Sequence, residues 1–67
     1  MHVSYSKLWK LLIDLNMSKS DLRKKAGLAT GTMTKLSKDE DVALDVIKRI
    51  CAVCNCNIGD TMDVLID

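Results

Sequence analysis

Apolar residues recur every three or four positions within short segments of this 67-residue chain, and polar clusters separate the segments. Such spacing is typical of amphipathic helices, whereas a half-buried strand alternates with a period of two. The intervening Ser, Thr, Asn, Asp and Gly residues are of the kinds that begin and end helices. The pattern therefore predicts five short helices, over about residues 6–15, 19–26, 30–37, 44–55 and 59–66. Residues 1–4 stay unassigned, since an extended conformation suits them equally well.

Each predicted helix has one apolar face, and together these faces define the expected core. Its members are Leu8, Leu11, Leu12, Leu15, Leu22, Ala26, Leu28, Met33, Leu36, Leu44, Ile47, Ile50, Cys51, Cys54, Met62, Leu65 and Ile66. The first helix also carries a second apolar stripe of Tyr5, Trp9 and Ile13, which is more apolar surface than one buried face requires. We expect this stripe to pack on the C-terminal segment, with a dimer contact as the alternative.

The size of the chain leaves room for a single domain, residues 1–67, and the succession of short helical segments predicts an all-α bundle. Apolar residues make up 48% of it and charged residues 28%, a balance typical of globular proteins. Sandwiches, barrels and doubly wound sheets need more residues than this. A chain of this length buries only about 60% of its unfolded surface, which favours support from oligomerisation.

Membrane and secreted classes are not supported by the sequence. The longest uninterrupted apolar run covers residues 50–54, far short of the ~18 residues that span a bilayer. Lys7, Lys10 and Asp14 interrupt the N-terminal apolar segment, so a signal peptide is not expected. Three cysteines, an odd number, do not form a disulfide framework. We expect a cytoplasmic protein with reduced thiols.

The most informative segment contains two predicted helices that meet at Gly27. Ser18 is a suitable N-cap for the first of them, and glycine takes the left-handed conformation that ends many helices. The apolar positions on both sides of Gly27 describe two helices that cross steeply and share one core. The second helix then leaves a short polar face free, made of Thr30, Gly31, Thr34, Lys35 and Lys38. Hydroxyl groups can reach base edges and lysines can reach phosphates, so this face suits the major groove of DNA.

Charge is distributed unevenly along the chain, although the net charge is only +1. Residues 1–38 hold eight basic and two acidic residues, which gives them +6. Residues 39–67 hold two basic and seven acidic residues, which gives them −5. A polyanion would therefore bind the first half, which contains the two-helix segment.

The run MSKSDLRKKAGLATGTMTKL, residues 17–36, resembles the helix-turn-helix of the Cro and phage-repressor-like (xenobiotic-response-element type) family of small bacterial transcriptional regulators. The flanking runs SYSKLWKLL and LDVIKRICAVCNCNIGDTMD also resemble this family, so the likeness extends from about Tyr5 to Val64. It implies a compact five-helix bundle of the phage-repressor-like DNA-binding type. Helices two and three would form the helix-turn-helix, about residues 18–37, and helix three would enter the major groove.

The resemblance also implies roles for individual residues. Those expected to face bases are Thr30, Gly31 and Thr34, and those expected to contact phosphate are Lys19, Lys35 and, from its place on the free helix face alone, Lys38. Two departures from the family pattern stand out. Arg23 replaces a small residue, so its aliphatic stem must lie along the core edge. Ala29 replaces a capping Ser or Thr, at a cost of about 1 kcal/mol.

Together these observations predict a sequence-specific regulator that binds double-stranded DNA, through a recognition helix at about residues 30–37, as a homodimer. Two alternatives remain open. One is a protein-interaction or antitoxin-like module that reads no DNA. The other is a thiol- or metal-responsive regulator that uses Cys51, Cys54 and Cys56.

The cysteines and the absence of catalytic motifs complete the sequence-based interpretation. Structural zinc usually has four ligands, and this chain offers three cysteines with its one histidine, His2, at the other end. We expect Cys51 and Cys54 to pack in the core, Cys56 to be the most exposed thiol, and no metal or cofactor to bind. No nucleophile–base set accompanies His2, so an enzyme is not predicted.

Overall fold

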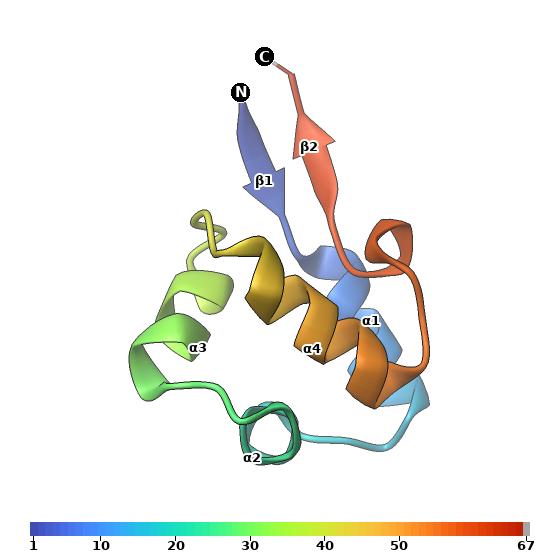
Figure 1. Cartoon of the computed structure of the whole chain (residues 1–67). Helices are drawn as coiled ribbons and strands as arrows, with labels where there is room; N and C mark the ends of the chain where they lie inside the picture. Colours follow the sequence, from blue (N-terminus) through green and yellow to red (C-terminus); the bar gives the residue numbers. More distant parts are fainter. Residues whose placement is uncertain (67) are drawn as a thin grey trace.

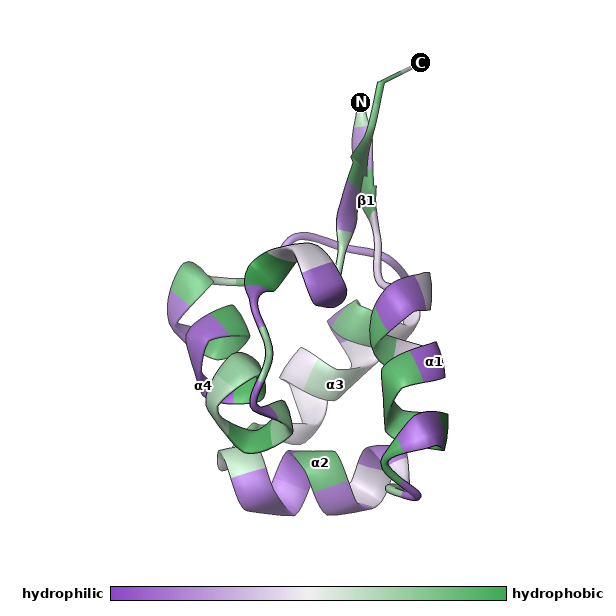
Figure 2. Ribbon diagram, turned by 90° about the vertical axis from the view of Figure 1, so that its right-hand side faces the viewer, coloured by the Kyte–Doolittle hydropathy of each residue, from purple (hydrophilic) through white to green (hydrophobic). Residues whose placement is uncertain are grey.

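The computed structural model describes residues 1–66, and it forms a helical body from which a narrow ribbon of two strands extends (Figures 1 and 2). Asp67, one of the seven acidic residues counted above, lies outside the described residues. The elements in chain order are β1 (His2–Ser4), α1 (Ser6–Asp14), α2 (Lys19–Ala26), α3 (Thr30–Ser37), α4 (Leu44–Cys54), the 3₁₀ helix η1 (Ile58–Asp60) and β2 (Asp63–Leu65).

The core lies inside the helical body, where α2 packs against both α3 and α4. Most of the buried core side chains are aliphatic: the core consists of Tyr5, Leu8, Leu12, Leu22, Ala26, Leu28, Met33, Leu36, Ile47, Ile50 and Cys54. The predicted inward positions of the helix-turn-helix are therefore confirmed. Burial of these side chains, at roughly 1.5–3 kcal/mol for a large aliphatic group, holds α2 and α3 at a fixed angle.

Helix α1 departs from its predicted packing on one side. Leu8 and Leu12 are buried as expected, but Leu15 is exposed. The second stripe does not pack as a unit on the C-terminal segment. Tyr5 is buried and donates its hydroxyl hydrogen bond to the Glu40 carbonyl, whereas Ile13 is 76% exposed.

The prediction of five helices in an all-α fold is wrong at the C-terminus. Residues expected to form a helix over 59–66 instead form the end of η1 and the strand β2. Strand β2 pairs with β1 in an antiparallel register that places Val3 opposite Val64. Thr, Asp and Val are poor helix formers, and cross-strand pairing satisfies the backbone groups that a helix would have used. The bundle thus has four α-helices and a two-stranded sheet within residues 1–66.

The turn before β2 is held by buried polar contacts. Thr61 is fully buried, and its hydroxyl donates to the Ile58 carbonyl at 2.8 Å. Its own carbonyl accepts a hydrogen bond of 3.1 Å from the Leu8 amide. These contacts join the turn to α1 and direct the chain out of the body into β2.

Helix α4 packs against α2 and completes the helical body. Ile47, Ile50 and Cys54 are buried as predicted, but Leu44 is 63% exposed because it opens the helix beyond the edge of the core. The helix ends at Asn55, which has the left-handed conformation with φ 52°. Within residues 1–66, no helix has both the length and the apolar character required to cross a membrane.

Candidate nucleic-acid interface

A capping box fixes the start of α2 and with it the position of Lys19. The Ser18 hydroxyl accepts a hydrogen bond of 3.0 Å from the Asp21 amide, and the Asp21 carboxylate accepts one of 3.0 Å from the Ser18 amide. The Ser18 cap predicted from the sequence is therefore confirmed. The same hydrogen bonds, mainly the one from the Ser18 amide, hold the pKa of Asp21 below its ordinary value. Lys19 is the first helical residue after this cap.

Gly27 forms the turn between α2 and α3, with φ 66° and ψ 40°. The Leu28 amide then returns to the Arg23 carbonyl at 2.9 Å, which satisfies the end of α2. The Gly27 carbonyl accepts a hydrogen bond of 3.4 Å from the Arg49 guanidinium on α4. Glycine adopts this backbone conformation without the steric cost of a Cβ atom, so the turn predicted at Gly27 is confirmed together with its physical reason.

Helix α3 buries one face and exposes the other, with Met33 and Leu36 on the buried side. The five residues predicted for the free face are all exposed: Thr30, Gly31, Thr34, Lys35 and Lys38. No side chain caps the helix at Ala29, as expected for alanine. The Thr34 hydroxyl instead donates a hydrogen bond of 3.1 Å to the Thr30 carbonyl within the same helix.

A hollow of about 300 Å³ lies between α2 and α3 on this exposed side. Its lining residues are Lys19, Ser20, Arg23, Thr30, Met33, Thr34 and Ser37. The structure thus brings together three of the predicted site residues, namely Lys19, Thr30 and Thr34. Gly31, Lys35 and Lys38 are exposed on the same helix or at its end, but outside the hollow.

Two residues next to this surface were not assigned to the site from the sequence. Arg23 was predicted only to lie along the core edge; it is half-buried and also lines the hollow. Its spacing of four from Lys19 places both on one helix face and could have revealed this role. The other residue is Trp9 on α1, whose ring centroid lies 4.1 Å from the Lys19 ammonium nitrogen. Local spacing gives no signal for a contact between two different helices.

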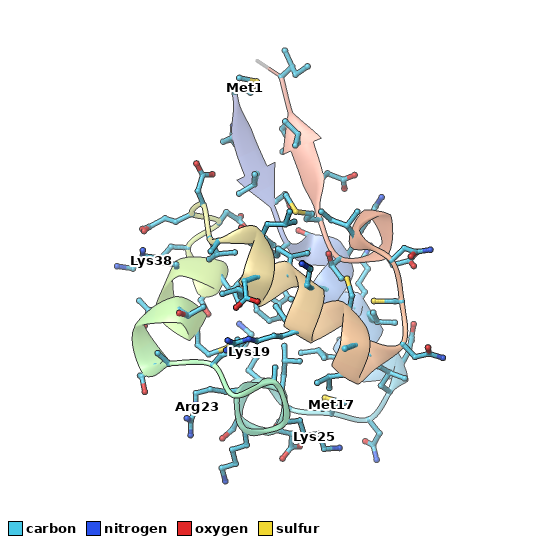
Figure 3. All side chains as sticks on the ribbon, in the orientation of Figure 1. Met1, Met17, Lys19, Arg23, Lys25 and Lys38 are labelled. Carbon is cyan, nitrogen blue, oxygen red and sulfur yellow. The ribbon has the colours of Figure 1, made fainter. Side chains whose placement is uncertain are left out.

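The charged side chains at this surface are cationic; Lys19, Lys35 and Lys38 are exposed and Arg23 is half-buried. Figure 3 shows Arg23 and Lys25 projecting from α2 and Lys38 projecting beyond the end of α3, all away from the helical body. Ion pairs elsewhere join Lys7 to Asp63 and Arg49 to Asp45, each at 3.0 Å. Among the residues that the structure describes, no ion pair holds Arg23, Lys35 or Lys38. Their charges are therefore available to an anion.

The three cysteines lie away from this surface, at the end of α4. Cys54 is buried as predicted, while Cys51 and Cys56 are both half-buried, so Cys56 is not distinctly the most exposed thiol. Burial, together with neighbouring Cys51, raises the pKa of the Cys56 thiol to about 11. The thiolate, which is the reactive and metal-binding form, is then scarce at Cys56 at neutral pH. No group of three or more His, Cys, Asp or Glu side chains within residues 1–66 is arranged to hold a metal ion.

A steep helix pair about a left-handed glycine, with a polar and cationic outer face, defines the helix-turn-helix class. Comparison with known protein families assigns the chain within that class. The family of Cro/C1-type helix-turn-helix DNA-binding domains matches residues 7–65, and the chain belongs to this family. The resemblance inferred from residues 17–36 and their flanks is confirmed.

A solved structure gives a second, independent likeness. The chain is similar to the crystal structure of the transcriptional regulator VanUg (form II), with 47% sequence identity and a TM-score of 0.95. The similarity covers 98% of this chain and 88% of that one. No match was found among curated proteins. The fold is therefore shared over nearly the whole chain with a protein described as a transcriptional regulator.

Proposed function

We propose that this protein is a cytoplasmic transcriptional regulator of a bacterium, which binds double-stranded DNA in a sequence-specific manner through its single domain, residues 1–67. Helix α3 enters the major groove, and the N-terminal part of α2 lies against the backbone. The observation that carries the proposal is the joint surface of α2 and α3. Four of the seven residues that line its hollow bear hydroxyl groups and two are basic, and the acidic half of the chain contributes none of them.

The roles proposed for individual residues follow their positions on this surface. Thr30, Gly31 and Thr34 face base edges, while Lys19, Lys35 and Lys38 neutralise phosphates. Arg23 joins the second group, because it shares the hollow with Lys19. Phosphate contacts set the affinity and the register of such a complex, whereas contacts with base edges determine the sequence that it selects.

Gly31 supports this proposal, because a glycine inside a helix lowers the stability of that helix. Glycine inside a helix is about 1 kcal/mol less favourable than alanine. Gly31 does not have a positive φ, and a Cβ atom added there would meet nothing within 4 Å. Neither the backbone nor the packing of this chain therefore requires glycine at this position. A missing side chain at the start of α3 instead lets the backbone approach a ligand closely.

Homodimerisation is part of the proposal and is supported by apolar residues that this chain leaves uncovered. Ile13, Leu44, Val64 and Ile66 are each more than half exposed. A symmetric dimer would bury part of this surface and present two copies of α3 to one face of DNA. The half-sites of such a dimer lie about 34 Å apart, one turn of the double helix. Binding alone, by exclusion or recruitment of other proteins, would then regulate transcription.

A substitution that adds a negative charge to the exposed face of α3 tests the proposed DNA binding. Thr34→Glu is expected to change the free energy of unfolding by only about 0.5 kcal/mol, because the side chain is exposed. It should abolish binding to duplex, since the carboxylate faces phosphates and acceptor-rich base edges. The matched control is Ser6→Glu, which adds the same charge at an exposed position on α1, outside the α2–α3 hollow. Electrophoretic mobility shifts with random duplex at low salt, together with thermal melts, measure both effects. Parental affinity in a folded Thr34→Glu variant would contradict the placement of α3 in the groove, and absence of duplex binding by the parent itself would favour a protein-interaction module.

A further inference from the structure

The ammonium group of Lys19 is held against an aromatic ring from another helix. Its nitrogen lies 4.1 Å from the centroid of the Trp9 ring, which is within the range of a cation–π interaction. Trp9 belongs to α1, is half-buried and packs against the core, so its ring has a fixed position. Lys19 is exposed and opens α2. The cation of an exposed side chain thus contacts a ring that is packed against the core.

This contact reduces the freedom of a side chain that would otherwise be highly mobile. Lysine has one of the largest rotamer entropies among side chains, and ordering it opposes any contact that it makes with a ligand. The ring contacts one side of the ammonium group, which has three N–H donors. The remaining donors stay free for an anion. Lys19 also lines the hollow between α2 and α3, so the held charge lies at the edge of the proposed DNA surface.

We propose that Trp9 is a positioning residue, which holds the Lys19 ammonium at the edge of the α2–α3 hollow for a DNA phosphate. This inference rests on the proposed function, and it adds a residue of α1 to a surface otherwise built from α2 and α3. Lys35 and Lys38 make no comparable contact with an aromatic ring within the described chain. Lys19 is therefore the lysine of the surface whose charge is placed before DNA arrives.

A double-mutant cycle tests the coupling between the two residues. Trp9→Leu removes the aromatic face, and Lys19→Met removes the charge but keeps an unbranched stem. A cation–π contact at an exposed site contributes enough to change affinity by about two- to fivefold. We expect Trp9→Leu to weaken binding to a random duplex of about 30 base pairs at low salt by that factor. In the Lys19→Met background, the same substitution should have no further effect.

The matched control replaces Lys24, an exposed lysine of the same helix that lies outside the hollow. In a Lys24→Met background, Trp9→Leu should retain its full effect on affinity. Trp9→Phe keeps an aromatic face and should restore most of the affinity, which a purely structural role of the indole would not explain. Thermal melts confirm that each variant is folded at the assay temperature. If Trp9→Leu does not fold, the cycle is carried out with Trp9→Phe, whose smaller effect should likewise vanish in Lys19→Met.

Fluorescence provides a readout that is independent of DNA, because Trp9 is the single tryptophan of the chain. Lys19→Met should change its emission in the free protein, and Lys24→Met should leave it unchanged. Equal effects of Trp9→Leu in the parent and Lys19→Met backgrounds would overturn the inference and leave the proposed function standing. Tighter binding by Trp9→Leu would also overturn it, since the ring would then compete with phosphate. Failure of the parent chain to bind any duplex would overturn both the role inferred for Trp9 and the proposed function.

Discussion

The hydroxyl group of Tyr5 donates a hydrogen bond of 2.8 Å to the main-chain carbonyl of Glu40. This bond joins the start of α1 to the loop that follows α3, and the tyrosine side chain is fully enclosed by the core. The Tyr5 amide also donates to the Asp39 carboxylate at 3.0 Å, so two hydrogen bonds connect the same segments. The end of the proposed recognition helix is thereby fixed to a distant part of the chain.

We expect Tyr5→Phe to lower the free energy of unfolding by about 1–2 kcal/mol, because it leaves the Glu40 carbonyl without its partner. Urea unfolding followed by circular dichroism measures this change. Ser6→Ala, at an exposed neighbouring position, should stay within about 0.5 kcal/mol of the parent. A Tyr5→Phe variant as stable as the parent would show that water replaces the lost donor without cost.

Gly31 and Gly27 should respond in opposite ways to the same substitution. Gly31→Ala should raise the free energy of unfolding by about 0.4–1 kcal/mol, because its φ is not positive and the added Cβ meets nothing within 4 Å. It should also weaken DNA binding, since the methyl group occupies space next to the groove. Gly27→Ala should destabilise by about 1–2 kcal/mol, because its φ is 66°. Thermal melts and mobility shifts on both variants check these expectations; a Gly31→Ala variant that binds DNA better would be the contrary result.

The capping box makes stability depend on pH. The pKa of Asp21 is lowered in the folded chain, mainly by the hydrogen bond from the Ser18 amide. A lowered folded pKa means that the stabilisation is present above the pKa of the unfolded chain, ~4, and is lost as the pH falls through the folded value. Urea midpoints measured from about pH 6 to 2.5 should therefore decline less steeply in Asp21→Asn than in the parent. Ser18→Ala should instead lower stability across the whole range, by about 1 kcal/mol at neutral pH. Identical pH profiles for parent and Asp21→Asn would exclude this carboxylate as a cause of the pH dependence of stability.

Salt should weaken DNA binding steeply, because the proposed contacts are largely with phosphates. With four proposed phosphate contacts per subunit, from Lys19, Arg23, Lys35 and Lys38, a dimer should show a slope of roughly −7 in a plot of log affinity against log salt concentration. Lys38→Met should reduce the magnitude of that slope by about 2, one contact from each subunit. Lys48→Met, on the acidic half of the chain, should leave the slope unchanged. A parent slope near zero would contradict an electrostatic mode of binding.

Local signals in the sequence were sufficient to predict the helix-turn-helix. Ser18 caps α2, Gly27 ends it, and the predicted bounds of α3 at Thr30 and Ser37 match the structure. Each of these features depends on residues within a few positions of one another. The polar face of α3 followed from the same periodicity, since burial of Met33 and Leu36 decides which residues remain outside.

The features that the sequence did not predict depend on how segments far apart in the chain pack together. The strand Asp63–Leu65 depends on a partner at the other end of the chain, so the isolated pattern of residues 59–66 suggested a helix. The contact between Trp9 and Lys19 likewise depends on how α1 and α2 pack, which periodicity within one helix does not specify. Leu44 is apolar and in helical register, but it lies beyond the edge of the core and stays exposed.

The pairing of β1 with β2 has a consequence for the order of folding. His2 lies opposite Leu65, so this pairing closes a loop that includes nearly the whole chain. The entropy lost on closing a loop grows with the length of the loop. A ribbon with three residues per strand forms few interactions that could offset this loss. Contacts within the helical body involve shorter separations and can form earlier. The ribbon therefore closes last during folding, and its amide protons are the first that the native protein exchanges with solvent.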